Sequence, residues 1–193
     1  MKKDVIFELY KKPQTVFSFK ELSILFPDLT YQSLKNKIQY ALRANKLKNP
    51  RKGFYAKDNF NPYELANKIY SPSYISLESI LQSEGLIFQA DRTITAISYL
   101  TREIEIDGRK IFYRKIKNEI LLNKEGIIEK DYFFSAIKER AFLDSVFLYK
   151  NYHFDNLEPL DWNKVSNLKK IYKSKILENR VNEYYQIYKN EHV

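Results

Sequence analysis

Between about Tyr31 and Asn45, apolar residues recur every three to four positions. This spacing places them on one stripe of a helix, and the hydroxyl group of Thr30 can cap its first turn. The stripe consists of Tyr31, Leu34, Ile38, Ala41 and Leu42. We therefore predict a helix over this segment, with the stripe facing a core.

A shorter helix is predicted directly before it. Ser18 and Glu21 have the spacing of a capping box, in which each side chain bonds the backbone amide of the other residue. The helix should end near Phe26, because Pro27 disfavours the helical conformation in the residue ahead of it. Two helices joined by a short turn are the core of a helix-turn-helix, and the apolar segment 5–10 supplies a third helix.

The segment after this helix pair has the pattern of a hairpin. Residues 46–49 and 54–56 are predicted to form two short strands around the turn Pro50-Arg51-Lys52-Gly53. Three helices followed by a basic hairpin describe a winged helix-turn-helix, which we place at residues 1–58.

A second domain is expected over residues 61–193. Asn61 and Pro62 occupy the cap and first position of a new helix, so the boundary should lie at about residues 58 to 61. Helical and alternating patterns follow, with Asp107-Gly108 as a hairpin turn. Helices are expected at about 74–84, 137–149, 163–172 and 175–189, and strands at 93–97, 103–106, 110–113, 119–122 and 131–134. The fold class is therefore α+β, an N-terminal winged helix-turn-helix followed by a mixed α+β domain with C-terminal helices.

Positive charge is concentrated in the predicted first domain. The chain carries 33 Lys and Arg against 24 Asp and Glu, a net charge of +9. Residues 1–57 hold 13 basic and four acidic residues, 13 − 4 = +9, so the rest of the chain is neutral overall. A positive module attached to a neutral body favours binding to a polyanion. The alternative is that these charges only form a solvated surface on a lysine-rich chain.

The helix face opposite the apolar stripe is the candidate DNA-binding surface. Asn and Gln side chains can bond bidentately to adenine, while lysines at the margins neutralise phosphates. Gln32, Asn36 and Arg43 lie at its centre, Ser33, Gln39 and Tyr40 beside them, Lys35 and Lys37 at the margins, and Arg51 and Lys52 on the wing. A solvated polar face is the alternative. Because caps, helical wheel, wing and charge agree, we expect double-stranded DNA as the partner.

The residue types offer little for catalysis. The chain has no Cys, which excludes disulfides and thiol chemistry, and its two His residues are too few for an ordinary zinc site. The four Gly residues stand apart, so no phosphate-cradling loop is present. Glu103, Glu105 and Asp107 could hold a nuclease metal, although the solvated face of a half-buried strand explains them more simply. We expect no catalytic residue, no cofactor and no metal.

The sequence also bears on location. No apolar run approaches the roughly 18 residues needed to cross a bilayer. Met1-Lys2-Lys3 has the charge of a signal-peptide start, but Glu8 and Lys11 interrupt the apolar core that should follow. We therefore expect a cytoplasmic protein with no membrane partner.

Two segments of the predicted second domain carry a family resemblance. Residues 73–79 (SYISLES), followed by Gly85, resemble a motif of the AbiEi-type antitoxins, and residues 136–144 (AIKERAFLD) resemble that family's Ala-x-x-Glu-(Lys/Arg)-Ala-Leu-Leu-Asp helix. In that family a winged helix with a Gly-aromatic-Tyr wing comes first, as Gly53-Phe54-Tyr55 does here. The resemblance covers the chain from about residue 18 to residue 144. The chain departs from the family pattern at residues 80–81 and 137–138. These changes look like variation of core and helix-cap residues.

The resemblance implies the antitoxin of a type IV toxin-antitoxin pair. Such an antitoxin represses its own operon by binding promoter repeats and counteracts a nucleotidyltransferase-like toxin without necessarily forming a stable complex. Taken alone, the motif residues are more simply packing residues than catalytic ones. A nucleic-acid-processing enzyme with a degenerate nuclease-like second domain is the alternative function. The operator and the oligomeric state stay open.

Overall fold

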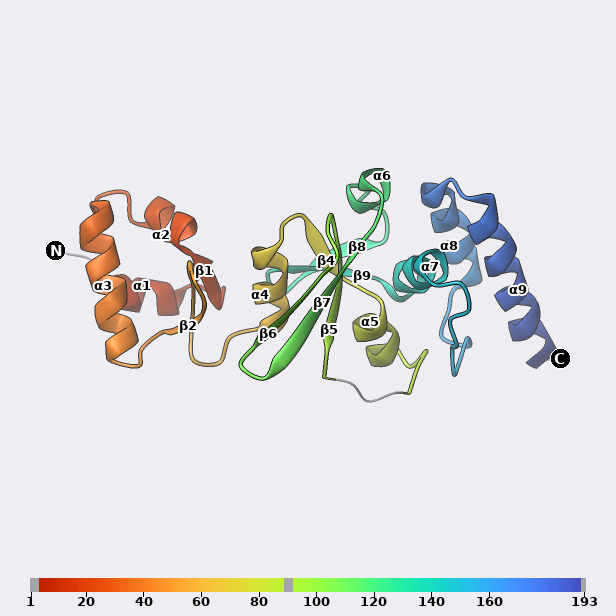
Figure 1. Cartoon of the computed structure of the whole chain (residues 1–193), viewed down its shortest axis with the longest axis horizontal. Helices are drawn as coiled ribbons and strands as arrows, with labels where there is room; N and C mark the ends of the chain where they lie inside the picture. The colour runs from red at the N-terminus through yellow and green to blue at the C-terminus, as the bar shows by residue number, and fades with distance from the viewer. Residues whose placement is uncertain (1–3, 89–91, 192–193) are drawn as a thin grey trace. The chain divides into compact units, whose positions relative to one another are not determined.

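The structure is a computed structural model that describes residues 4–88 and 92–191 (Figure 1). Its fold is mixed α+β, which confirms the α+β part of the predicted fold class. Contacts within the chain divide it into two units, Met1–Lys68 and Ile69–Val193.

Three helices and a three-stranded sheet make up the described part of the first unit as far as Lys57. The helices are α1 (Val5–Lys11), α2 (Phe19–Leu25) and α3 (Tyr31–Arg43), and the strands are β1 (Val16–Ser18), β2 (Lys48–Arg51) and β3 (Phe54–Ala56). Strand β3 lies between β1 and β2 and pairs antiparallel with both. The predicted helices and hairpin strands are confirmed to within a few residues. Strand β1 was not predicted, because three residues are too short for a period-two pattern to show.

Side-chain caps fix the starts of these helices, as the sequence indicates. The Ser18 amide donates to the Glu21 carboxylate at 2.6 Å, and the Glu21 amide donates to the Ser18 hydroxyl at 3.2 Å. The Ser33 amide donates to the hydroxyl of Thr30 at 3.2 Å. Asp4 caps α1 in the same way.

Helix α3 packs its apolar stripe into the core of the first unit. The buried members are Leu34, Ile38 and Ala41. Two members of the predicted stripe differ from expectation. Tyr31 is 64% exposed, because it begins the helix and its ring lies against that of Phe19, 4.9 Å away, rather than in the core. Leu42 is only half-buried.

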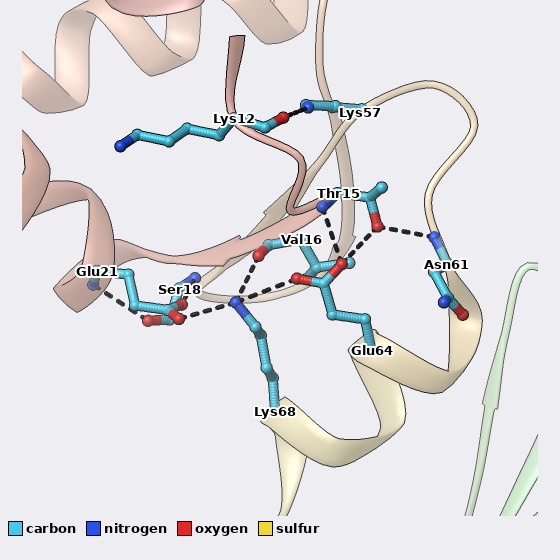
Figure 2. A network of polar contacts seen from close by, with 9 residues as sticks. All are labelled: Lys12, Thr15, Val16, Ser18, Glu21, Lys57, Asn61, Glu64 and Lys68. Atoms are coloured by element: carbon cyan, nitrogen blue, oxygen red, sulfur yellow. Dashed lines mark hydrogen bonds and ion pairs between the residues drawn. The ribbon is translucent and has the colours of Figure 1, made fainter. Parts of the chain in front are cut away.

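Helix α4 (Pro62–Ile69) is tied to the first unit by polar contacts (Figure 2). The buried Glu64 carboxylate accepts hydrogen bonds from the amide and the hydroxyl of Thr15, at 2.8 and 2.6 Å. The Lys68 ammonium donates to the Val16 carbonyl at 2.6 Å and to Glu21 at 2.8 Å. The contacts therefore divide the chain after Lys68 rather than at the predicted residues 58 to 61.

The second unit is built on a six-stranded sheet in the order β6-β7-β5-β4-β9-β8. The strands are β4 (Ser73–Ile75), β5 (Ile94–Ser98), β6 (Arg102–Ile106), β7 (Arg109–Lys115), β8 (Ile127–Lys130) and β9 (Phe133–Ala136). Strands β5 and β7 run parallel, as do β4 and β9, and the other neighbours are antiparallel. The predicted hairpin turn is confirmed, with φ of +50° at Asp107 and +71° at Gly108.

Helices cover this sheet in layers (Figure 1). Helices α5 (Glu78–Ser83) and α7 (Lys138–Leu148) pack against the sheet, and α8 (Trp162–Leu168) and α9 (Lys175–Glu191) pack against α7. A short helix, α6 (Asn118–Leu121), precedes β8, and a 3-10 helix (Lys169–Tyr172) follows α8. None of the helices within the described ranges combines the length and the apolar character needed to span a membrane.

Three predicted elements are corrected by the structure. The helix predicted at 74–84 begins only at Glu78, because residues 73–75 form strand β4 between β5 and β9. The strand predicted at 119–122 is the helix α6. The strand predicted at 131–134 starts late, because Asp131 and Tyr132, with φ of +47° and +67°, form the turn between β8 and β9.

Candidate nucleic-acid interface

The polar face of α3 carries most of the residues predicted to contact DNA. The exposed ones are Gln32, Lys35, Asn36, Gln39, Tyr40 and Arg43, and Ser33 and Lys37 are half-buried. Tyr40 is 68% exposed. One helix thus presents most of these side chains on the side away from its buried stripe, and Ser33 and Lys37 lie nearer the stripe.

Two amide side chains on this face are joined to each other. The Nε2 atom of Gln32 donates to the Oδ1 atom of Asn36 at 2.8 Å, across one turn of the helix. Both side chains are exposed, so their remaining polar groups face solvent.

A groove lies beside the face, between α3 and the start of α1. Its lining residues are Asp4, Val5, Ile6, Asn36, Lys37, Tyr40 and Lys46. Sequence reasoning had not identified Asp4 or Lys46 as part of this surface. The position of Asp4 depends on how α1 packs, which no local pattern reveals, whereas Lys46 follows the end of α3, where its amide donates to the Ala41 carbonyl at 2.8 Å.

The wing residues Arg51 and Lys52 lie at the turn between β2 and β3. Arg51 ends β2 and is half-buried, whereas Lys52 is exposed. The side chain of Asn49, which sequence reasoning missed, donates to the carbonyls of Arg51 and Phe54 at 2.9 and 2.7 Å. Gly53 adopts a φ of +87°, a conformation that glycine reaches without steric cost. The turn therefore has a defined shape.

The cations predicted to contact DNA on α3 and at Lys52 form no ion pairs with neighbouring acids among the described residues. The first unit holds 14 basic and six acidic residues, 14 − 6 = +8, against 19 − 18 = +1 for the second. Four of the six acids pair with other lysines, as Glu8 with Lys11, Asp58 with Lys48, and Glu21 and Glu64 with Lys68. Within the part of the chain that the structure describes, no ion pair involves Lys35, Lys37, Arg43 or Lys52.

A second polar cluster lies in the core of the second unit. Asp144 accepts hydrogen bonds from the hydroxyls of Tyr74, Ser76 and Tyr172, the last at 2.6 Å, and Arg140 lies 3.6 Å from its carboxylate. All five side chains are at most 2% exposed. The two segments that carry the family resemblance therefore meet at Asp144. Their burial favours a packing role over direct chemistry.

The acidic residues considered as metal ligands face solvent. Glu103, Glu105 and Asp107 are exposed, and Glu103 lies 3.6 Å from the ammonium of Lys110. The solvated strand face expected from the sequence is confirmed for Glu103 and Glu105, whereas Asp107 lies in the turn after β6. Among the described residues, no group of three or more His, Cys, Asp or Glu is placed to hold a metal ion.

Comparison of the chain with protein-family models and with curated proteins found no match. The resemblance to the AbiEi-type antitoxins therefore rests on the sequence motifs and their order along the chain.

Proposed function

We propose that the first unit is a winged helix-turn-helix that binds double-stranded DNA with α3 in the major groove. The observation that carries this proposal is the cationic, polar face of α3. Lys35, Lys37 and Arg43 lie there without an ion-pair partner among the described residues. Such cations bond phosphates, and the amide side chains between them can bond base edges.

The order of the elements supports the proposal. Helices α2 and α3, joined by residues 26–30, are the two helices that a helix-turn-helix requires. Strands β2 and β3 form a hairpin directly after α3, which is the place of a wing. The buried stripe of α3 leaves its opposite face free to enter a groove about 12 Å wide.

Salt dependence tests the DNA contacts. Replacing Lys35, Lys37, Arg51 and Lys52 with Ala should weaken binding to every duplex. It should also flatten the plot of log affinity against log salt by about 0.9 for each phosphate that the variant no longer binds. A matched variant replaces four exposed lysines of the second unit, Lys130, Lys150, Lys170 and Lys175. Equal slopes for the two variants would contradict the assignment of phosphate contacts to α3 and the wing.

The biological role that we propose is that of an antitoxin and autorepressor. The first unit would repress the chain's own operon, and the second would counteract a nucleotidyltransferase-like toxin, as the resemblance to AbiEi-type antitoxins implies. Both motif segments are buried around Asp144. This burial supports a second unit that has a core of its own. Counteraction of the toxin does not require a stable complex.

Co-expression separates the two roles. The full chain should rescue growth of cells that express a nucleotidyltransferase-like toxin encoded beside it, and should repress a reporter driven by its own promoter. The four-site Ala variant of α3 and the wing should lose repression and keep rescue. Loss of both activities by a folded variant would mean that the two roles are not separable. Failure of the full chain to rescue would contradict the antitoxin role.

The nuclease alternative gains no support from the acidic strand. Its candidate ligands are exposed, and one of them pairs with a lysine. We therefore propose no enzymatic function.

A further inference from the structure

The geometry of α3 points to adenine as the base that its centre reads, through the joined amides of Gln32 and Asn36. This inference rests on the proposed function, that α3 lies in the major groove. It adds the chemical identity of one base pair in the bound DNA.

The hydrogen bond between the two amides determines what they offer to a ligand. Gln32 donates and Asn36 accepts, so the Gln32 carbonyl oxygen, the second N–H of Gln32 and both N–H groups of Asn36 stay outside the bond. Exchanging the two roles leaves a matching set, one carbonyl oxygen and three N–H groups outside the bond. The pair therefore presents an acceptor beside a donor at the exposed centre of α3.

Among the four bases, adenine matches this arrangement. In the major groove adenine offers the N7 acceptor and the N6 amino donor, one for each side of the pair. Guanine offers two acceptors and no donor, so the free carbonyl oxygen would be left without a partner. Cytosine offers only a donor, and thymine offers an acceptor and a methyl group.

A phosphate group fits the pair less well than adenine does. Phosphate oxygens accept hydrogen bonds, so the free carbonyl oxygen would repel them. The side chains suited to phosphate are instead Lys35 and Lys37 at the margins of the face. The competing explanation is structural, since an amide pair one turn apart also stabilises a helix slightly.

The test uses the full chain and duplexes selected from a randomised pool. Wild-type protein should select a motif with one invariant adenine, and Asn36→Ala should lose the preference at that position. In the wild-type motif, 7-deazaadenine at that position removes N7 and keeps base pairing. Wild-type affinity should then fall about 5- to 150-fold. The Asn36→Ala variant should bind both duplexes equally. Asn167→Ala, at an exposed Asn of α8, is the control and should keep the full sensitivity to 7-deazaadenine.

The outcomes distinguish the inference from the proposed function. Absence of binding to any duplex would overturn both. Binding with normal salt dependence but without sensitivity to 7-deazaadenine would overturn the adenine contact alone. The same conclusion would follow if Asn36→Ala lost helix content by circular dichroism and kept the adenine preference. The amide pair would then serve the helix and not the base.

Discussion

The hydroxyl of Tyr74 donates to both carboxylate oxygens of Asp144, at 3.2 and 3.1 Å, across 70 residues of sequence. Tyr172 adds a donor at 2.6 Å. Burial raises the pKa of both tyrosines well above 10, and the charge of Asp144 raises it further, so both hydroxyls stay protonated. Asp144 thereby joins β4, α7 and the 3-10 helix.

Replacing Asp144 with Ala should destabilise the second unit by about 3–5 kcal/mol. The change leaves the guanidinium of Arg140, which is fully buried, without its carboxylate. Tyr74→Phe should cost less, about 1.5–3 kcal/mol, because it removes one donor to a charged group. Trp162 is the one Trp of the chain and its ring lies 5.8 Å from that of Phe142 in this core, so its fluorescence during urea unfolding measures the loss.

Asp131→Asn is the matched control for this prediction. Asp131 is exposed at the turn between β8 and β9, with a φ of +47° that Asn also adopts. The free energy of unfolding of the Asp131→Asn variant should stay within about 0.5 kcal/mol of the wild-type value. If Asp144→Ala has the same free energy of unfolding as Asp131→Asn, the buried cluster does not contribute to stability.

Elements defined by local signals could be predicted from the sequence. The capping box of Ser18 and Glu21 and the hairpin turn at Asp107-Gly108 depend on residues a few positions apart, and both are confirmed. The polar face of α3 followed from helical spacing in the same way. These features needed no knowledge of the rest of the fold.

Elements defined by distant pairing could not be predicted. Tyr74 lies in a strand because β4 pairs with β5 on one side and β9 on the other. Leu77, where the chain turns into α5, adopts a φ of +57°, which leucine rarely does. The groove beside α3 likewise depends on the packing of α1, so no local signal placed Asp4 there.

Lys68→Met should lower the stability of the first unit by about 2–3 kcal/mol. The buried Glu64 loses an ammonium at 3.3 Å, and the Val16 carbonyl loses its donor, while the bonds from Thr15 remain. Hydrogen exchange of β1 and α2 in the full chain measures the effect. Lys20→Met, at an exposed position of α2, is the control. Equal protection in the two variants would contradict a stabilising role for α4.

Glu21 should make the first unit sensitive to acid. Burial raises the pKa of its carboxyl, but hydrogen bonds from Lys68 and Ser18 lower it by more, so the pKa lies below 4.5. A lowered pKa gives stability above the unfolded-state value, which is lost as pH falls through the folded-state value. Glu21→Gln should therefore be less stable than wild type near pH 7 and should approach it below pH 4.5. Unfolding followed across this range measures the difference.

Asp28→Asn is the control for this pH dependence. Asp28 is an exposed acid of the same unit, and exposed single charges contribute little to stability. The stability of this variant should follow the wild-type curve. A Glu21→Gln variant that keeps the full wild-type dependence on pH would show that another carboxyl is responsible.

Asp4→Asn tests where bound DNA lies. The Asp4 carboxylate accepts a hydrogen bond from the Ile6 amide at 2.9 Å and lines the groove with Lys37 and Lys46. Asn caps helices as well as Asp does, so the variant keeps the cap and removes the charge. If DNA phosphates approach this groove, the variant should bind every duplex more tightly. The gain should reach about 5-fold at low salt, since one like charge about 4 Å away costs about 1 kcal/mol in water.

The salt dependence of the gain and a control substitution in the second unit test this prediction further. The gain should shrink as salt rises and should be lost near 1 M salt, where the Debye length shortens to about 3 Å. Glu129→Gln, on the exposed strand β8 of the second unit, changes the net charge equally and should not improve binding as much. Equal gains from the two variants at every salt concentration would mean that the duplex responds only to net charge. The interface would then lie away from the start of α1, and the face of α3 that contains Asn36 would have to be reassigned.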